Sequence, residues 1–371
     1  MTDILIVLNY YSPYVSGLTN VARDVAEGLA ARGWVVTVIA SQHSPDLPLE
    51  EIINNVKVIR TPVLLKIGKG VISPSFITTF KRESAKAKVV NIHTPMLEAG
   101  IIAKISKAPV VMTYQCDISL PPTLLGRIQN SILDISTQIA ANNSKFVTVT
   151  SDDYADHSRV KKSLSVSRKV IPATCYIRTG GIPKYRYGDG FHVGFLGRIV
   201  EEKGIEYLVD GFRSIEDKDA RLVIAGDFNS IVGGSVIDKV KQRIGEDSRI
   251  KLLGFLPDEE LNNFYASLDV FALPSINPFE AFGIVQVEAM MRGIPVIASD
   301  LPGVRQPVLA TGMGEIVKPR SASSITDALK RLMTSRPDTI QGAIKAKELY
   351  SLDATLDKFE ATFKQAMMMT M

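Results

Sequence analysis

Short apolar runs alternate with amphipathic helical stretches along the whole chain, and this alternation restricts the fold more than any other feature. In the first half, five β-branched runs predict strands: Ile4–Asn9, Trp34–Ala40, Val89–Ile92, Pro109–Thr113 and Phe146–Thr150. Between the first two, within Leu18–Arg32, Val21, Val25 and Leu29 recur at helical spacing. Gly33 then ends the predicted helix. A strand, a helix and a second strand in this order are the unit of a parallel sheet.

A second series of the same kind fills the second half. Its predicted strands are His192–Leu196, Arg221–Ala225, Ile250–Leu253, Val270–Leu273 and Ile294–Ala298. Its predicted helices are Ile205–Phe212, Val236–Ile244, Asp258–Ser267, Ile284–Met291 and Ala322–Thr334. Two such series in tandem predict two doubly wound parallel sheets.

The two series are separated by residues 174–190, where Tyr, Gly, Pro and Arg crowd together (IRTGGIPKYRYGDG) and predict a linker. A chain of 371 residues is also too long for a single core. We therefore expect an α/β protein with Rossmann-like domains over residues 1–180 and 190–350, facing each other across a cleft. A last helix, about residues 355–371, is long enough to pack back on the first domain.

The composition is ordinary for a soluble globular protein, with 46% apolar and 22% charged residues. Two cysteines, Cys116 and Cys175, provide neither a disulfide framework nor a metal-ligand cluster. No basic segment precedes the apolar run of residues 1–8, so this run is interpreted as a buried strand and not as a signal peptide. We expect a cytoplasmic protein, with peripheral association on the inner face of the membrane as an open alternative.

The charge is unevenly distributed. Residues 1–190 carry 22 Lys and Arg against 14 Asp and Glu, whereas the remainder carries a net charge of −4. A basic cluster in the first half could face anionic lipid, although an ordinary solvated surface is the other interpretation: Lys66, Lys69, Lys81, Arg82, Lys86 and Lys88. Nucleic acid is not an expected partner, because aromatic residues are sparse among these basic residues and no recognition motif is present.

Two carboxylates, Glu280 and Glu288, lie eight positions apart around a Phe282-Gly283 break. The helix predicted from Ile284 would rise roughly 12 Å over eight residues. Carboxylates accept hydrogen bonds from vicinal hydroxyl pairs, so this short element could hold two sugar rings. The alternative is a pair of solvated helix residues, which the apolar neighbours make less favourable.

The second predicted domain opens with the sequence GFLGRIVEEKG, which places two cations after its first strand. Ligands of open α/β sheets collect beyond the carboxyl ends of strands, so Arg198 and Lys203 mark an anion site near a helix start. Two cations suit a diphosphate whose charge grows as it leaves. The alternative is that both cations pair with Glu201 or Glu202 on a solvated surface.

Polar residues also follow the strands of the first predicted domain. Gly17 ends a loop that lacks the dinucleotide glycine triplet but could let a ligand approach the helix start. His93 follows one strand, and the segment containing Gln115 and Asp117 follows the next. We expect these segments to converge on one rim. No zinc-ligand spacing or Walker loop is present in the sequence.

Together these segments resemble the retaining glycosyltransferases of family 4, the group 1 glycosyltransferases. The most specific parts are GRIVEEKG, PFEAFGIVQVEAM and RGIPVIASDLPG, and the resemblance covers nearly the whole chain. It implies a GT-B fold of two Rossmann-like domains, with a nucleotide sugar bound mostly by the second. It also implies that this sugar is a substrate and that no cofactor is needed.

The resemblance also implies a role for each residue. Arg198 and Lys203 would bind the donor diphosphate and, with Glu280 on the hexose hydroxyls, form the catalytic set. Glu288 would bind the ribose hydroxyls. Further contacts would come from the backbone of Phe282, Gly283 and Ile284, from Gly17 against the diphosphate, and from His93, Gln115 and Asp117 on the acceptor side.

The chain departs from the family pattern at two positions. Many relatives have two glycines where this chain has Ser16-Gly17, and many have His where it has Gln115. Gln cannot accept a proton, so it cannot act as a general base and would only position groups.

We therefore expect a retaining, metal-independent hexosyltransferase that uses a UDP- or GDP-linked donor. The expected acceptor is a hydroxyl of a glycan or glycolipid, such as a lipid-linked or cell-envelope glycan. The basic N-terminal domain could hold such an acceptor at an anionic membrane surface. A sugar-nucleotide epimerase of similar fold and a non-catalytic sugar-nucleotide or membrane-surface binding protein are the alternatives.

Overall fold

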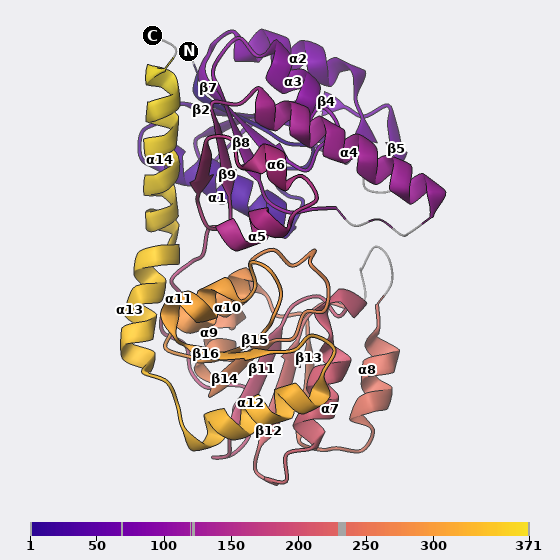
Figure 1. Cartoon of the computed structure of the whole chain (residues 1–371), viewed down its shortest axis with the longest axis vertical. Helices are drawn as coiled ribbons and strands as arrows, with labels where there is room; N and C mark the ends of the chain where they lie inside the picture. The colour runs from indigo at the N-terminus through magenta and orange to yellow at the C-terminus, as the bar shows by residue number, and fades with distance from the viewer. Residues whose placement is uncertain (1, 68–69, 119, 121–122, 229–234, 370–371) are drawn as a thin grey trace. The chain divides into compact units, whose positions relative to one another are not determined.

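The structure is a computed structural model that describes the chain except residues 1, 68–69, 119, 121–122, 229–234 and 370–371 (Figure 1). It divides into two compact units. Unit 1 comprises residues 1–174 and 352–371, and unit 2 comprises residues 175–351. The division falls at Thr174, so the segment expected to be a linker belongs to unit 2.

Unit 1 is built on an eight-stranded sheet of order β10-β9-β8-β7-β1-β2-β4-β3. Its strands are β1 (Thr2–Val7), β2 (Val36–Gln42), β3 (Glu50–Ile53), β4 (Val56–Pro62), β7 (Ala87–Thr94), β8 (Val110–Tyr114), β9 (Phe146–Val149) and β10 (Arg168–Val170). Neighbouring strands are parallel except β3, which forms an antiparallel hairpin with β4 at the edge. A separate antiparallel pair is formed by β5 (Leu65–Ile67) and β6 (Gly70–Ile72).

Helices cover both faces of this sheet (Figure 1). They are α1 (Gly17–Ala31), α2 (Pro74–Ser84), α3 (Ala99–Ile105), α4 (Leu124–Asn142), α5 (Asp152–His157), α6 (Lys161–Leu164) and α14 (Leu352–Met368). The last helix supplies Phe359 and Phe363, both fully buried, to unit 1. The central strands β7 and β1 bury most of their side chains, because a parallel sheet with helices on both faces leaves few of them in water.

Unit 2 is built on a six-stranded, fully parallel sheet of order β13-β12-β11-β14-β15-β16. Its strands are β11 (His192–Leu196), β12 (Arg221–Ala225), β13 (Ile250–Gly254), β14 (Val270–Leu273), β15 (Val296–Ser299) and β16 (Gly314–Val317). A 3₁₀ turn, Glu201–Lys203, precedes the helices α7 (Ile205–Arg213), α8 (Ile237–Ile244), α9 (Asp258–Ala266), α10 (Ile284–Met291), α11 (Gln306–Thr311), α12 (Ala322–Thr334) and α13 (Thr339–Tyr350).

The expected fold class, with two doubly wound parallel sheets, is confirmed. The strand order of each sheet reverses once, between β1 and β7 in unit 1 and between β11 and β14 in unit 2. Ligands of doubly wound sheets bind at the carboxyl ends of the strands where the order reverses. The topology therefore places a candidate site at the carboxyl ends of β1 and β7 in unit 1, and of β11 and β14 in unit 2.

Several elements were not predicted from the sequence: the β3–β4 hairpin, α2 to α6, β10, α11, β16 and α13. Most of them are short, and short elements give weak periodicity. The longest of them is α4, a helix of 19 residues whose Leu and Ile side chains are mostly exposed and not buried.

Candidate functional site

The site in unit 2 forms where two loops meet between the neighbouring strands β11 and β14. The loop after β11 contains the 3₁₀ turn, and the loop after β14 leads to α10. The backbone N–H of Ile276 donates to the carbonyl of Glu202 at 2.9 Å. A Cβ atom at Gly204 would lie 2.4 Å from the carbonyl oxygen of Pro274, so only glycine allows this approach. The two loops are thus fixed to each other at the switch point.

Lys203 and Glu280 form an ion pair at this place. Lys203 ends the 3₁₀ turn, and Glu280 lies in the loop before α10. Both side chains are mostly buried, with 18% and 17% exposed. The hydroxyl of Ser275 lies 3.5 Å from the same carboxylate. Two predicted site residues that are 77 positions apart in the sequence are therefore in direct contact.

Both helices that start at this switch point begin with a left-handed glycine. Gly204 precedes α7 with φ of 61°, and Gly283 precedes α10 with φ of 82°. Among the described residues, no side chain caps either helix start. The first N–H groups of a helix need a partner and carry its positive dipole end. Two uncapped helix starts beside Lys203 make this place favourable for an anion.

The segment around Gly283 is fixed by packing. Phe282 is buried, and its carbonyl accepts a hydrogen bond from Nε2 of Gln286 at 2.6 Å. Ile284, half-buried, is the first residue of α10. A Cβ atom at position 283 would lie 2.4 Å from Cδ2 of Leu273, so this position requires glycine for both space and φ.

Arg198 does not contact Glu280 or Glu288. Its guanidinium donates to Glu202 at 2.8 Å, and its side chain is 45% exposed. The solvated pairing that the sequence left as an alternative is therefore the arrangement of Arg198. A flexible, exposed side chain loses little when it exchanges such a partner, because exposed ion pairs contribute little free energy.

Glu288 lies inside unit 2, at 5% side-chain exposure, and not on a solvated helix face. Its Oε2 accepts a hydrogen bond from the Tyr265 hydroxyl at 3.0 Å and contacts Nε of Arg178 at 3.0 Å. Burial raises the pKa of Glu288, and the charge of Arg178 opposes that shift. Arg178 also donates to Asp258 at 2.8 Å. Of the four predicted residues, Lys203 and Glu280 are in direct contact with each other, whereas Glu288 contacts Arg178 and Tyr265.

The residues of unit 1 that were expected on the acceptor side lie near the switch point of its sheet. The α1 helix starts at Gly17, and a Cβ atom there would meet nothing within 4 Å. Nε2 of Gln115 lies 3.2 Å from the carbonyl of Leu18 and 2.8 Å from Nδ1 of His93. The start of α1, His93 and Gln115 are therefore together, as expected.

His93 is fully buried, and burial lowers its pKa to about 3. The amide nitrogen of Gln115 can only donate, so Nδ1 of His93 accepts and the ring proton lies on Nε2. This Nε2 has no hydrogen-bond partner among the described residues. His93 is consequently a neutral donor at neutral pH and not a cation.

Asp117 belongs to a hydrogen-bonded network within unit 1. Its Oδ1 accepts from the Tyr114 hydroxyl at 2.5 Å and from Ser158 at 3.1 Å. Its backbone N–H donates to the hydroxyl of Tyr154 at 2.9 Å. Asp117 thus fixes the loop after β8 through hydrogen bonds to Tyr114, Ser158 and Tyr154.

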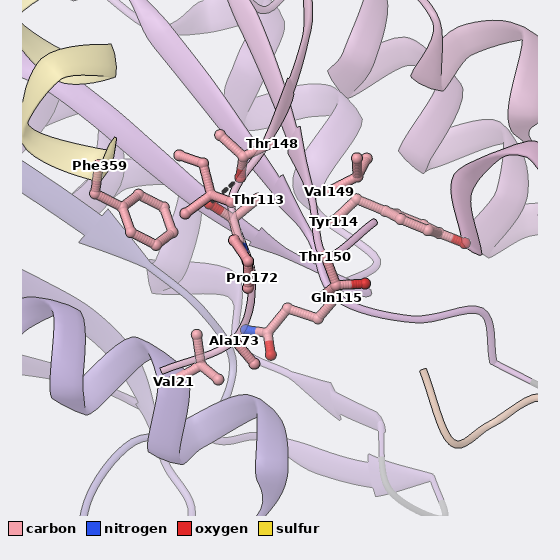
Figure 2. Close-up of a pocket in the computed structure, with 11 residues that line it drawn as sticks. Val21, Thr113, Tyr114, Gln115, Thr148, Val149, Thr150, Pro172, Ala173 and Phe359 are labelled. Atoms are coloured by element: carbon pink, nitrogen blue, oxygen red, sulfur yellow. Dashed lines mark hydrogen bonds between the residues drawn. The ribbon is translucent and has the colours of Figure 1, made fainter. Parts of the chain in front are cut away.

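Figure 2 shows a small cavity beside Gln115, closed by Phe359 of α14 and Val21 of α1. Its volume of about 10 Å³ is just enough for one water molecule and far too small for a sugar. Its Thr113 and Thr148 hydroxyls bond to each other at 3.0 Å. This cavity is a packing gap and not an acceptor site.

Comparison with known proteins connects this geometry to an enzyme family. A family profile described as "Glycosyl transferases group 1" matches residues 184–348, and one described as "Glycosyl transferase 4-like domain" matches residues 16–173. The two matches coincide with unit 2 and with most of unit 1. The chain belongs to the group 1 glycosyltransferases, glycosyltransferase family 4.

Three similar proteins align with most or nearly all of this chain. An uncharacterized glycosyltransferase of Methanocaldococcus jannaschii is 27% identical over 100% of this chain and 99% of its own. The phosphatidyl-myo-inositol mannosyltransferase of Mycobacterium leprae is 27% identical over 85% of this chain and 83% of its own. The structure of Anabaena HepE in complex with UDP-glucose is 18% identical, with a TM-score of 0.71, over 98% and 100% of the two chains, which shows a shared fold.

The sequence analysis did not identify the two residues that contact Glu288, Arg178 and Tyr265. Arg178 lies in the segment interpreted as a linker, and Tyr265 lies on the predicted helix that became α9. The only signal in the sequence was a basic residue in a Gly- and Pro-rich segment. Tyr265 reaches Glu288 from α9, and Arg178 reaches it from the segment between β10 and β11, and no local pattern reveals either contact.

Proposed function

We propose that this glycosyltransferase moves a hexose from a UDP- or GDP-linked sugar to a hydroxyl acceptor with retention of the anomeric configuration. It would need neither a metal nor a cofactor. The observation that carries the proposal is the Lys203–Glu280 pair at the unit 2 switch point, beside two uncapped helix starts. A cation beside free N–H groups suits a diphosphate, and a carboxylate suits sugar hydroxyls.

The donor would bind by exchanging partners. The diphosphate would take Lys203 from Glu280 and draw Arg198 away from Glu202, which releases the Glu280 carboxylate to accept from hexose hydroxyls. The N–H groups of Gly283 and Ile284 at the start of α10 would meet the phosphate oxygens. Both steps replace an ion pair by another charge-assisted contact, so neither leaves a buried charge unpaired.

Glu288 would contribute to ribose binding through the oxygen that does not contact Arg178. Its other oxygen is held by Tyr265 and Arg178. Arg178 therefore acts as a positioning residue, because it opposes the effect of burial on the pKa of Glu288 and fixes the orientation of the carboxylate.

The chemistry would proceed on one face of the sugar. The bond between the anomeric carbon and the phosphate oxygen breaks, the acceptor oxygen bonds to the same face, and the leaving phosphate oxygen takes the acceptor proton. Lys203 and Arg198 would stabilise the charge that develops on this leaving group. Gln115 cannot accept a proton and His93 is held neutral with a pKa near 3 by burial, so both are assigned positioning roles on the acceptor side. The resemblance also assigns Gly17 to the diphosphate and Asp117 to the acceptor side.

The donor and acceptor classes rest on relatives. HepE was solved with UDP-glucose, so UDP-hexoses are the first donors to test, with GDP-hexoses next. The mycobacterial relative is named for a phosphatidylinositol acceptor, which favours a glycolipid or lipid-linked acceptor here. The named relatives are transferases, so the comparisons do not favour an epimerase or a non-catalytic binding protein.

A panel of UDP-, GDP- and ADP-hexoses tests this function, with thermal unfolding as the readout. A true donor stabilises the protein by about 2.7 kcal/mol at a concentration 100 times its Kd. We expect one nucleotide class to do so, and Glu280→Gln to abolish the preference for the sugar while keeping affinity for the nucleoside diphosphate. The conservative change keeps the shape of the side chain and its contact with Lys203.

Transfer to a hydroxyl acceptor is then followed in the presence of EDTA, with the product anomer assigned by NMR. Retained configuration and undiminished turnover support the proposal. An inverted product, an EDTA-sensitive rate, or isomerised donor without acceptor would each refute the corresponding part of it.

A further inference from the structure

The helix α4 of unit 1 carries a stripe of exposed apolar side chains. The stripe consists of Leu124, Leu125, Ile128, Ile132, Ile135 and Ile139, which are between 40% and 78% exposed. From residue 125 onwards the spacing alternates between three and four, so all of them lie on one helix face. The stripe runs from Leu124 to Ile139, roughly 22 Å of helix. A stripe of this kind usually faces a core, and here it does not.

The stripe continues onto the neighbouring helix α3. The hydroxyl of Ser136 on α4 donates to the carbonyl of Leu97 at 2.7 Å and accepts from the N–H of Gly100 at 2.9 Å. Leu97 and Ile101, next to these contacts, are 45% and 57% exposed. We call these two residues and the six of the stripe the α3–α4 surface, and both helices lie on the outside of the sheet of unit 1 (Figure 1).

Contiguous apolar surface of this extent needs an explanation. The largest exposed patch on a typical soluble monomer is roughly 300–600 Å² and marks a docking site when it is larger. The α3–α4 surface joins eight exposed Leu and Ile side chains on α4, on α3 and just before α3. So much apolar side chain in water favours an occupant that contacts this surface from outside. No helix among the described residues is long and apolar enough to cross a membrane.

Most charged residues beside the α3–α4 surface are basic, whereas Glu98, between Leu97 and Ile101, is half-buried and accepts a hydrogen bond from Nδ2 of Asn9 at 3.3 Å. Lys104 and Lys107 follow Ile101 on the α3 side, and Arg127 lies on the other flank of the stripe. All three are exposed, and none forms an ion pair within the part of the chain that the structure describes. The acidic residue of α4, Asp134, is held by Arg159 through two hydrogen bonds of 2.9 Å. The rim thus presents uncompensated positive charge.

We propose that the α3–α4 surface docks on an anionic lipid bilayer, with the apolar stripe in the interface and the basic rim against the headgroups. An amphipathic helix with an apolar face and basic flanks binds such a surface in its plane. A second copy of this chain fits less well, because a two-fold interface would oppose the same basic rim to itself without an acid to pair with it.

This surface is not the basic cluster expected from the sequence. In that cluster Arg82 and Lys86 share Glu83, and Lys88 pairs with Asp3. Lys69 lies outside the described residues. Three of the cations expected to attract lipid are therefore already compensated by carboxylates.

Sedimentation with vesicles tests the proposal without donor or acceptor. We expect the full chain to sediment with phosphatidylglycerol vesicles far more than with phosphatidylcholine vesicles, and less at high salt. Lys104→Gln with Arg127→Gln should weaken binding about fivefold for each charge removed. Ile128→Gln with Ile135→Gln should weaken it at least tenfold at any salt.

The matched control is Ile340→Gln with Ile344→Gln on α13, two exposed isoleucines of unit 2 at 72% and 45%. This variant should bind vesicles like the wild type. Donor-induced thermal stabilisation should be unchanged in all three variants, which separates loss of docking from loss of fold and from failure of the proposed transferase function.

Three outcomes would overturn the proposal. One is wild-type protein that does not sediment with anionic vesicles. Another is equal binding to both lipids and by all variants. The third is a dimer in size-exclusion chromatography that Ile128→Gln with Ile135→Gln dissociates, which would make the surface an interface between copies.

Discussion

Lys203 is the residue on which the proposed donor site depends most. Its mostly buried side chain pairs with Glu280. Lys203 lies just before the start of α7 and contacts the loop that leads to α10. A diphosphate at this place would find one full positive charge and two partial ones. Arg198, exposed and paired with Glu202, can add a second charge only after it reorients. Lys203 should therefore contribute more than Arg198 to leaving-group stabilisation.

Lys203→Ala should lower turnover by roughly 10²–10³, the scale of losing one preorganised group that stabilises developing charge. The measurement is single-turnover transfer from the donor identified by thermal stabilisation. Arg331→Ala is the matched control, because Arg331 also pairs with a glutamate of unit 2, Glu315 on β16, but away from the switch point. Equal turnover of the two variants would contradict the assignment.

Burial of His93 makes the stability of unit 1 depend on pH. The folded pKa is about 3 and the ordinary value is 6.5, so between these values the unfolded chain binds a proton that the folded chain does not. Stability is therefore highest above pH 6.5 and falls as the pH drops toward 3, by about 1.4 kcal/mol per pH unit.

His93→Gln should remove this dependence. Urea unfolding at neutral pH and at about 1.5 pH units below the ordinary histidine value should show the stability difference between wild type and variant shrink by about 2 kcal/mol. A difference that stays constant would mean that His93 is protonated in the folded protein as well.

At the scale of elements, the proposed donor site depends on how α7 and α10 begin. Each helix starts at a left-handed glycine without a side-chain cap, whereas α1, α12 and α13 are capped by Ser16, Ser321 and Asp338. A capping side chain at 204 or 283 would occupy the N–H groups that an anion needs. The glycines thus serve the ligand as well as the turn.

Gly283→Ala should destabilise unit 2 by about 1–3 kcal/mol and weaken donor binding, because the new Cβ meets Leu273 at 2.4 Å in a strained backbone conformation. Gly312→Ala is the control, with a similar φ of 70° and open space around the Cβ. It should show the backbone strain alone and leave donor binding unchanged. Chemical denaturation and donor titration measure both effects, and equal donor affinity would refute the role of the α10 start.

At the scale of the whole molecule, the two ends of the chain meet in unit 1. The chain leaves unit 1 at Thr174, builds unit 2, and returns with α14, whose Phe359 packs beside Val21 and Thr113. The C-terminal helix is thus part of the first core, although it is last in the sequence. Stability of unit 1 should depend on it.

Phe359→Ala should lower the free energy of unfolding of unit 1 by about 3–5 kcal/mol, since it removes a fully buried ring. Met368→Ala on the same helix, at 71% exposure, should have little effect. Urea unfolding followed by site-resolved hydrogen exchange distinguishes the units. Loss of protection in unit 2 before unit 1 would contradict this division.

The sequence by itself determined the local elements and the class of fold. The strands β11, β12 and β14 and the helices α10 and α12 have the predicted bounds, because apolar periodicity and glycine stops are local properties. The motif around Gly283 likewise predicted a helix start. The stripe of α4 follows helical spacing too, but burial does not enforce it, and it was missed.

Only the tertiary structure determined which charged side chains pair with each other. Lys203 pairs with Glu280 across 77 positions, Arg198 takes its neighbour Glu202, and Glu288 is buried against Arg178. These partners follow from the order of strands in the sheet and from helix packing, which bring together residues that no periodicity relates. Electrostatic energy depends on the distance between charges and on their burial, and the spacing of residues along the chain determines neither.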